Sequence, residues 1–318
     1  MKWLLIPLFW AACVAAGYLY TQPRGVPWEV TRAVAPAFVL EATLFLALAS
    51  ESIRKHMEKF PPAAVASMLV LAAVAPYALA ALVMGSFSWL HLGALAVLAA
   101  VLSFWYVVLP HNPLTDAGLL AFAAAVVLLK VFPQVYARPH EGLALEALGT
   151  AMWIRTGLFA ILSVRRVKNI GFGFWPELRE LKIGLVFFIG LLALAAPLGW
   201  AIDFTRPEWP TGKEWAELPL TFFGTLWVLA LGEELFFRGL LQQWMCGWLK
   251  NDWAGLLVTA VVFGSLHVFK DPFPNWRFVA VATLAGVFYG LAFQQGKGIR
   301  ASMVTHALTV TTWKTFFS

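Results

Sequence analysis

The sequence predicts an all-α polytopic membrane protein, a bundle of about eleven transmembrane helices. Of its 318 residues, 61% are hydrophobic and only 13% are charged, whereas a soluble domain carries about 25% charged residues. Apolar segments of about 17–25 residues, long enough to cross a bilayer as helices, recur along the whole chain. They leave no room for a sizeable soluble domain, so the lipid bilayer is the first expected partner.

The expected spans follow from these apolar runs in chain order. The first run contains no clear signal-peptidase site and is followed by further spans, so we expect an uncleaved helix there. Nine or ten spans are the alternative, if N-terminal runs are re-entrant or lie at the interface. The expected spans are residues 1–20, 33–50, 63–84, 89–109, 117–132, 146–164, 183–202, 218–249, 253–270, 277–294 and 300–317.

The charge distribution indicates orientation and narrows the choice of partners. The net charge is +6, and its basic residues lie in short loops between apolar spans, as the positive-inside rule describes. The richest basic loop, from Arg165 to Lys182, is therefore placed in the cytoplasm. This pattern argues against nucleic acid as a partner and predicts a multi-pass protein of a cell membrane, with the bacterial inner membrane as the expected location.

Charged side chains interrupt three of the expected spans. Three of them lie in the segment from Glu233 to Gly239, and the others are Glu41 and Arg155. Each costs roughly 2.5–3.5 kcal/mol at the centre of a membrane helix, so each needs a partner or a water-filled cavity. For Glu41 and Arg155 two interpretations are open, a structural tie to a neighbouring helix or to the interface, and a functional role.

The spacing around Lys250 predicts a pair of facing residues. Glu233 lies seventeen residues before Lys250 and His267 lies seventeen after it. In an antiparallel hairpin both would stand about 25 Å from the turn at 1.5 Å per residue, at one depth. Glu234 and Arg238 are four residues apart and are expected to form an ion pair along the helix. Glu233 points about 100° away from Glu234, which leaves it free to act.

The segment Glu233–Gly239 has the pattern EExxFRG, which resembles the signature of the CAAX-protease and bacteriocin-processing (CPBP, or Abi) family of intramembrane proteases. A second family motif, FxxxH, is matched by Phe263–His267. A third motif supplies another histidine, matched by His306. The resemblance covers about residues 180–318 and implies a CPBP-like intramembrane protease domain there. The resemblance does not extend to residues 1–170, which are expected to form an N-terminal transmembrane region of unknown role.

The resemblance implies the roles of the site residues. Glu233 is expected to activate the attacking water, with His267 as its partner. His306 is expected to contribute to the same site. It lies about eight residues, or roughly 12 Å, from the turn at residues 296–298, so it reaches the depth of Glu233 only if the hairpin around Lys250 projects further into the cytoplasm. Glu234, Arg238, Phe263 and Thr309 are expected to support the site.

One position departs from the family pattern. The histidine of the third motif is usually followed four residues later by Asn, and that place is taken here by Val310. Because Val310 cannot donate a hydrogen bond, Thr309, Thr311 or His306 itself would have to stabilise the oxyanion. Losing one such donor typically costs ~10²–10³ in rate, which weakens an enzyme without abolishing its activity.

Two chemistries fit a glutamate with two histidines. The resemblance to the CPBP family, whose members look like glutamate-dependent enzymes, favours a mechanism that uses no cofactor. The alternative is a zinc site, which would need three protein ligands and an open position, supplied by His267 and His306 with Glu233 or Glu234.

Three classes of function are compatible with this pattern. The first is an intramembrane endopeptidase of the CAAX prenyl protease-related type, acting on a membrane-associated peptide or protein. The second is a non-catalytic membrane scaffold or immunity-type protein that retains the fold, which the Val310 departure favours. The third, a transporter using the buried charges as a relay, predicts two halves with internal symmetry, and no such repeat is evident.

Overall fold

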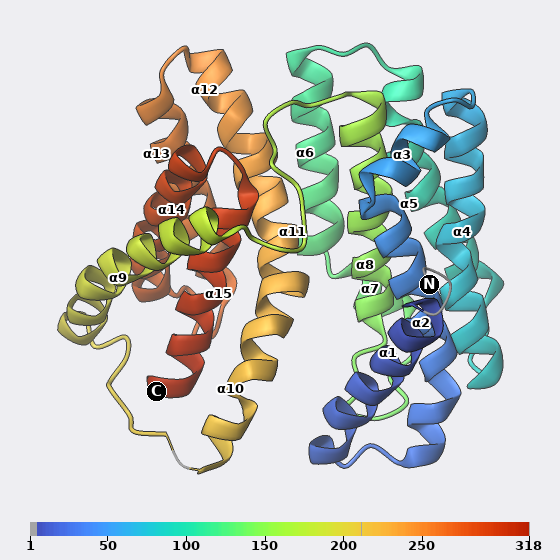
Figure 1. The fold of residues 1–318 in the computed structure, drawn as a ribbon, viewed down its shortest axis with the longest axis horizontal. Helices are drawn as coiled ribbons and strands as arrows, with labels where there is room; N and C mark the ends of the chain where they lie inside the picture. Colours follow the sequence, from blue (N-terminus) through green and yellow to red (C-terminus); the bar gives the residue numbers. More distant parts are fainter. Residues whose placement is uncertain (1–4, 211, 318) are drawn as a thin grey trace. The chain divides into compact units, whose positions relative to one another are not determined.

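The computed structural model describes residues 5–210 and 212–317 and is almost entirely helical in that range (Figure 1). Its described residues contain no β-strand. The one backbone bridge, between Pro207 and Phe317, ties the loop that precedes α10 to the C-terminal end of the chain. The predicted all-α fold class is therefore confirmed. The chain divides into two compact units, Met1–Arg166 and Val167–Ser318, each described here by itself.

The N-terminal unit is a bundle around the long helices α2, α4, α5 and α8. α2 packs against both α4 and α8, and α4 packs against α5. The last helix continues into a short π-helical stretch, η3 (Phe159–Val164). The helices are α1 (Leu5–Thr21), α2 (Trp28–Ala49), α3 (Glu51–Met57), α4 (Pro62–Val83), α5 (Trp89–Val108), α6 (Pro113–Leu128), α7 (Val131–Val135) and α8 (Glu146–Leu158), with the 3₁₀ turn η2 (Gln22–Arg24) after α1.

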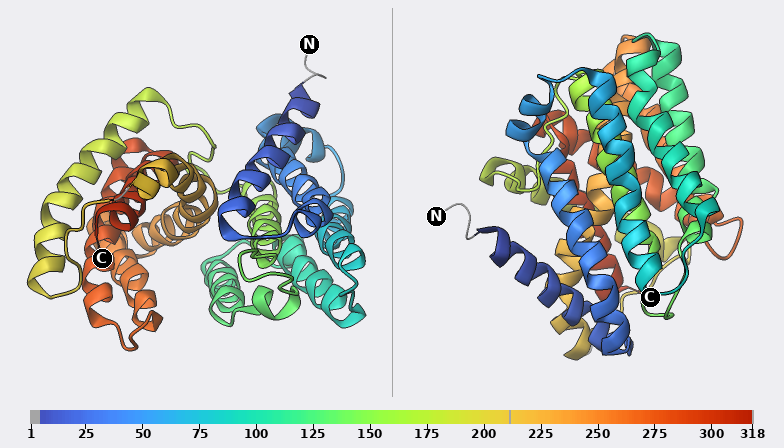
Figure 2. Two further views of the ribbon diagram at one scale, coloured as in Figure 1. Left: turned by 90° about the horizontal axis from the view of Figure 1, so that it is seen from below. Right: turned by 90° about the vertical axis from the view of Figure 1, so that its right-hand side faces the viewer.

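The C-terminal unit contains all the motifs identified in the sequence. In Figure 2, α9 lies along the outside of this unit, where it packs against α14 and α15. The elements are α9 (Leu178–Ala201), α10 (Gly212–Gly224), η4 (Thr225–Ala230), α11 (Leu231–Glu234), η5 (Leu235–Gln242), α12 (Gln243–Leu249), α13 (Asp252–Ser265), η6 (Leu266–Phe269), α14 (Trp276–Gly296) and α15 (Ile299–Phe316).

Eight helices in the described part of the chain are long and apolar enough to cross a membrane, so the protein is multi-pass, but the expected count of eleven is not confirmed. They are Trp28–Ala49, Pro62–Val83, Trp89–Val108, Glu146–Val164, Leu178–Ala201, Glu217–Leu249, Asp252–Phe269 and Trp276–Gly296. The remaining three expected spans are helical, but α1 has 17 residues and α6 has 16. α15 is less apolar because its buried residues include Ser302, Thr305 and His306.

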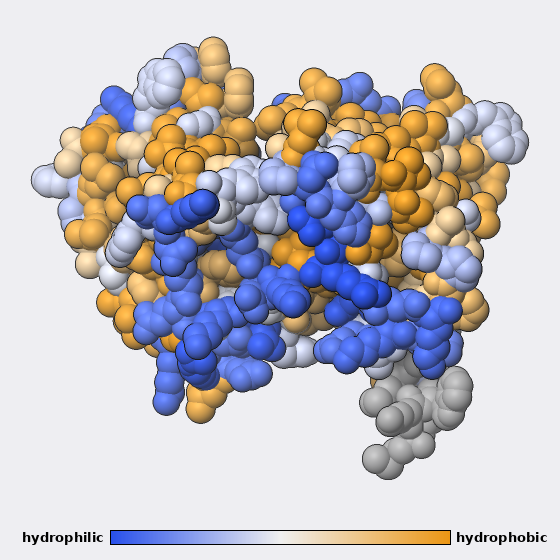
Figure 3. Space-filling model, turned by 90° about the horizontal axis from the view of Figure 1, so that it is seen from above, coloured by the Kyte–Doolittle hydropathy of each residue, from blue (hydrophilic) through white to orange (hydrophobic). Residues whose placement is uncertain are grey.

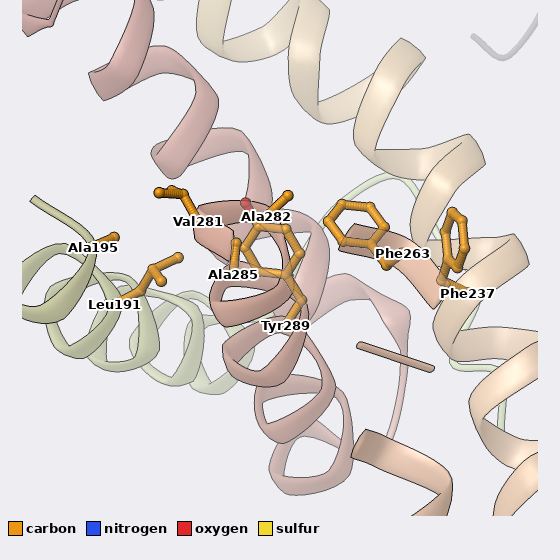
Figure 4. Packing of buried hydrophobic residues seen from close by; sticks show 8 residues of the cluster. All are labelled: Leu191, Ala195, Phe237, Phe263, Val281, Ala282, Ala285 and Tyr289. Carbon is orange, nitrogen blue, oxygen red and sulfur yellow. The ribbon is translucent and has the colours of Figure 1, made fainter. Parts of the chain in front are cut away.

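The core of the C-terminal unit lies where α9, η5, α13 and α14 meet. Its buried side chains include Leu191, Phe237, Phe263 and Tyr289 (Figure 4). α13 and α14 approach closely at Gly264, within the FxxxH segment, where any Cβ atom would collide with the Thr283 hydroxyl. Only glycine permits this approach, which fixes the helix that carries His267 against α14.

Glu41 and Arg155, the isolated charges of the N-terminal unit, pair with each other. Arg155 on α8 donates from Nε to one carboxylate oxygen of Glu41 on α2 at 2.8 Å, and from Nη2 to the other at 2.9 Å. Their side chains are 0% and 3% exposed. A second, partly buried pair joins Arg165 to Asp116 at 2.8 Å. The structure thus supports the first interpretation of Glu41 and Arg155, a tie between neighbouring helices.

Candidate active site

The two glutamates of the EExxFRG segment lie on a short, regular part of a distorted helix. α11 is a single α-helical turn, and it is preceded by the π-helical stretch η4 and followed by the π-helical stretch η5. π-helical turns are rare and are frequently found at functional sites. Each widens the helix, which changes the direction in which the following side chains point. No pattern in the sequence predicted these stretches.

Glu234 is the buried centre of the cluster. Its Oε1 accepts a hydrogen bond from Arg238 Nη1 at 3.2 Å and another from His306 Nδ1 at 2.8 Å. The side chains of Glu234 and Arg238 are both 0% exposed. The ion pair predicted from their four-residue spacing is therefore confirmed. Because a carboxylate can only accept a hydrogen bond, His306 Nδ1 carries the proton of this contact. The other ring nitrogen, Nε2, does not contact Glu234.

Arg238 is enclosed by aromatic rings and one backbone carbonyl. Its Nη2 donates to the carbonyl oxygen of Gly286 on α14 at 3.1 Å. The guanidinium carbon lies 4.6 Å from the ring centroid of Phe263 and 5.2 Å from that of Tyr289, within the range of a cation–π contact. Phe263, the first residue of the FxxxH motif, thus helps to stabilise the buried cation.

Glu233 differs from its neighbour in exposure. Its side chain is 34% exposed, whereas that of Glu234 is 0% exposed, as expected if the two point in different directions. Glu233 Oε2 lies 3.8 Å from His306 Nε2. This distance is too long for a direct hydrogen bond, and it leaves room for one water to contact both atoms. The histidine next to Glu233 is thus His306.

Tyr289 on α14 is a site residue that the sequence analysis missed. Its ring stacks on the imidazole of His306, with centroids 4.6 Å apart and planes 16° apart, and its side chain is buried. The stack and the hydrogen bond that His306 donates to Glu234 hold the imidazole from two sides. The sequence contains a signal that could have identified Tyr289. Tyr289 lies eight residues before the turn at Lys297 and His306 lies nine after it, so an antiparallel hairpin places the two side chains at nearly the same depth.

His267 lies on η6, one turn from Phe263. Its Nδ1 contacts the carbonyl oxygen of Phe263 at 3.0 Å, and its ring lies 4.5 Å from that of Phe278. Since a carbonyl only accepts, Nδ1 carries the proton, and in the neutral ring Nε2 is an acceptor. Within the described residues, the ion pairs of Glu233 and Glu234 involve His306 and Arg238, and none involves His267.

The hairpin register predicted for His267 agrees with the packing one turn away. Phe237 and Phe263 lie thirteen residues before and after Lys250, and their ring centroids are 5.0 Å apart. Glu233 and His267 are each four residues further from the turn. The contact therefore supports the prediction that these two residues lie at the same depth, and their direct cooperation stays a prediction.

The position of His306 follows from the projecting hairpin. Figure 1 shows that α12 and α13 extend beyond the turn between α14 and α15. His306 lies only nine residues after Lys297, whereas Glu234 and Glu233 lie sixteen and seventeen residues before Lys250. Because the hairpin projects, His306 nevertheless lies next to both glutamates. Trp244 and Trp248 stack at the projecting end, with centroids 6.3 Å apart.

The residues around Val310 offer few hydrogen-bond donors. The Thr309 hydroxyl donates to the carbonyl oxygen of Thr305 at 2.7 Å, which leaves only its acceptor capacity. Thr311 is buried, and its hydroxyl has no hydrogen-bond partner among the residues described. Val310 itself is partly buried one turn after His306. Thr311 and His306 thus remain as candidate donors, and His306 is the one whose ring nitrogen lies 3.8 Å from Glu233.

The described residues do not provide the ligands that the zinc alternative requires. Across residues 5–210 and 212–317, no three His, Cys, Asp or Glu side chains lie close enough together to hold a metal ion, and a catalytic zinc needs three protein ligands. We therefore derive no step through a metal.

A family model matches the part of the chain that contains this site. Residues 215–312 match the model described as type II CAAX prenyl endopeptidase Rce1-like, which confirms the resemblance drawn from the three motifs. No curated protein and no solved structure was found to match the chain.

Proposed function

Because residues 215–312 belong to the Rce1-like family of type II CAAX prenyl endopeptidases, we propose that this multi-pass membrane protein is an intramembrane endopeptidase in which Glu233 activates water. The observation that carries the proposal is the contrast between the two adjacent glutamates. Glu234 is buried and engaged by Arg238 and His306, whereas Glu233 is 34% exposed and faces His306 Nε2 across 3.8 Å.

In the proposed reaction Glu233 acts first as a base and then as an acid. Its carboxylate takes a proton from water while the water oxygen forms a bond to the carbonyl carbon of the scissile peptide. The tetrahedral intermediate then collapses, the carbon–nitrogen bond breaks, and the proton held by Glu233 passes to the leaving amine. The products are a carboxylic acid, which loses its proton to the amine or to solvent, and the amine, and no other reactant is required.

His306 is proposed to stabilise the oxyanion in place of the family asparagine. The cluster contains two carboxylates, Glu233 and Glu234, and one permanent cation, Arg238. A His306 ring protonated on both nitrogens would balance these charges, donating from Nδ1 to Glu234 and from Nε2 toward the reacting centre. Glu234 and Tyr289 act through His306 as positioning residues. His267, whose Nε2 is an acceptor, is proposed to help orient the water.

The family description and the location of the proposed site support a proposal for the substrate class. The description names CAAX prenyl endopeptidases, and Glu233 lies within the membrane-crossing segment Glu217–Leu249. We propose that the substrate is the C-terminal segment of a protein held at the membrane by a lipid on its cysteine. The inner membrane of a bacterium is the proposed location.

The test uses the purified full-length protein in lipid nanodiscs and a fluorescent peptide that ends in Cys-aliphatic-aliphatic-X, with and without a farnesyl group on the cysteine. We expect cleavage of the farnesylated peptide, no cleavage by Glu233→Gln at an unchanged melting temperature, and no effect of a zinc chelator. Matched activity of wild type and Glu233→Gln would overturn the proposed base. Inhibition by the chelator would reinstate the zinc alternative.

A non-catalytic scaffold is the second candidate, favoured by Val310 in place of the family asparagine. It predicts that Glu233 is only a structural partner. Glu233→Gln would then lower the melting temperature and leave the biological output unchanged, the opposite of the enzyme outcome.

A further inference from the structure

A surface hollow on the C-terminal unit combines two cations with apolar side chains. The hollow has a volume of about 450 Å³ and is lined by Leu178, Arg179, Lys182, Ile183 and Gln295. Four of the five are on the first turns of α9, and Gln295 is on the last turn of α14. The hollow is distinct from the residues of the candidate active site.

The two cations of the hollow have no carboxylate partner in the described residues. Arg179 and Lys182 are exposed, and Arg179 Nη2 donates only to the backbone carbonyl of Gln295, at 3.2 Å. The nearest carboxylates along α9, Glu177 and Glu180, are both engaged by Arg300, at 3.5 and 2.9 Å. The positive charge of the hollow is therefore not neutralised within the protein.

The location of the hollow indicates what would neutralise it. α9 is one of the membrane-crossing helices, and Arg179 and Lys182 lie in its first two turns, where a spanning helix passes through the headgroup layer. Leu178, 69% exposed, and Val186, 65% exposed, present apolar surface on the same helix. Figure 3 shows one face of the molecule, on which hydrophilic residues gather beside broad apolar surface.

We propose that this hollow binds the headgroup of an anionic phospholipid. Arg179 and Lys182 contact the phosphate, and Leu178 and Ile183 contact the start of an acyl chain. A basic hollow beside a membrane helix on the cytoplasmic side suits anionic lipid headgroups, and the basic segment from Arg165 to Lys182 places this end of α9 in the cytoplasm. Binding of the lipid requires no catalysis, so the proposal is independent of the proposed protease function.

The test is a lipid titration of the full-length protein in detergent, followed by native mass spectrometry. The probes are dioleoylphosphatidylglycerol, dioleoylphosphatidylcholine and inorganic phosphate. We expect tighter binding of the anionic lipid than of the zwitterionic one. The double variant Arg179→Gln/Lys182→Gln should weaken that binding about tenfold or more, because each basic side chain contributes substantially at an anionic surface.

Two further variants separate a specific site from general attraction. Lys168→Gln/Lys250→Gln removes two exposed lysines of the same unit that lie outside the hollow, and it should keep the affinity for the anionic lipid. Arg179→Lys/Lys182→Arg keeps both charges and should also keep it. Equal binding of the two lipids, an equal loss in the lysine control, or binding of inorganic phosphate as tight as that of the anionic lipid would overturn the proposal.

Discussion

Among the described residues, each unit contains a glutamate–arginine pair with both side chains almost fully buried. The two pairs differ in whether the arginine contacts both carboxylate oxygens or only one. In the N-terminal unit, Arg155 occupies both oxygens of Glu41, at 2.8 and 2.9 Å. In the C-terminal unit, Arg238 contacts one oxygen of Glu234 at 3.2 Å, and that oxygen also accepts from His306. The other oxygen of Glu234 has no hydrogen-bond partner among the described residues.

This difference separates a structural pair from the cluster that we propose as the active site. A bidentate arginine–carboxylate pair has a strong, fixed geometry. The pair at Glu41 joins α2 to α8, and among the described residues neither side chain forms a hydrogen bond with a further ionisable group. The pair at Glu234 instead holds His306, which faces a second, partly exposed carboxylate on Glu233. Buried charge alone therefore does not identify an active site. The distinguishing feature is the adjacent carboxylate of Glu233, whose side chain is 34% exposed.

The largest expected effect is the loss of peptide cleavage when Glu233 of the C-terminal unit is replaced, compared with the same replacement of Glu41 in the N-terminal unit. Glu233→Gln keeps the shape of the side chain but cannot take a proton, so we expect the rate of peptide cleavage to fall at least ~10²-fold, the usual contribution of a general base. Its melting temperature should not fall, because a neutral amide is cheaper to desolvate than a carboxylate. Cleavage kinetics and thermal melts in the same nanodiscs are the measurements.

The matched control for this change is Glu41→Gln. It removes a buried negative charge beside Arg155 and should lower the melting temperature, while the cleavage rate per folded molecule stays the same. A Glu41→Gln protein that is stable but inactive would show that the N-terminal unit takes part in the reaction, and the comparison between the two pairs would fail.

The second expected effect concerns the two arginines. Arg155→Ala and Arg238→Ala each leave a buried carboxylate without its partner, which costs about 3–5 kcal/mol of unfolding free energy. We expect both variants to unfold at lower denaturant concentration. Arg238→Ala should also reduce the cleavage rate, because Glu234 then holds His306 less firmly, and Arg155→Ala should not.

A double variant that removes both charges of the Glu41–Arg155 pair provides the control for the arginine variants. Glu41→Leu/Arg155→Leu replaces the pair by apolar side chains and should recover most of the stability lost in Arg155→Ala. If the double variant is no more stable than the single one, the loss does not come from an unpaired charge. A stable but inactive Arg238→Ala would instead indicate that Arg238 acts on the substrate.

Much of the C-terminal site was predictable because its determinants are local or nearly so. The pair of Glu234 and Arg238 follows from helical spacing, and the hairpin register follows from equal distances along the chain from Lys250. The depth of His306 required a further assumption, that the α12–α13 hairpin projects. The same antiparallel argument, applied to Lys297, would also have identified Tyr289.

The remaining features depend on contacts that no local pattern encodes. Glu41 and Arg155 are 114 residues apart, and nothing in the sequence links two single charges in separate apolar runs. The π-helical stretches η4 and η5 depend on packing around the motif helix. The expected count of eleven membrane-crossing helices is not confirmed, because α1 and α6 have only 17 and 16 residues and α15 has polar residues on its buried side.

The smallest expected effect tests the tyrosine that stacks on His306. Aromatic stacking contributes about 0.5–1.5 kcal/mol beyond area burial, so Tyr289→Leu should lower kcat about two- to tenfold and change KM little, because the ring positions His306 and does not contact substrate. Tyr289→Phe keeps the stacked ring and should retain the wild-type kcat. Tyr77 in the N-terminal unit provides the comparison, since its ring contacts that of Tyr136 with centroids 5.5 Å apart. Tyr77→Leu should lower the melting temperature and leave kcat unchanged. If Tyr289→Phe loses as much activity as Tyr289→Leu, the hydroxyl and not the stacked ring supports the reaction, and the positioning role of the ring is wrong.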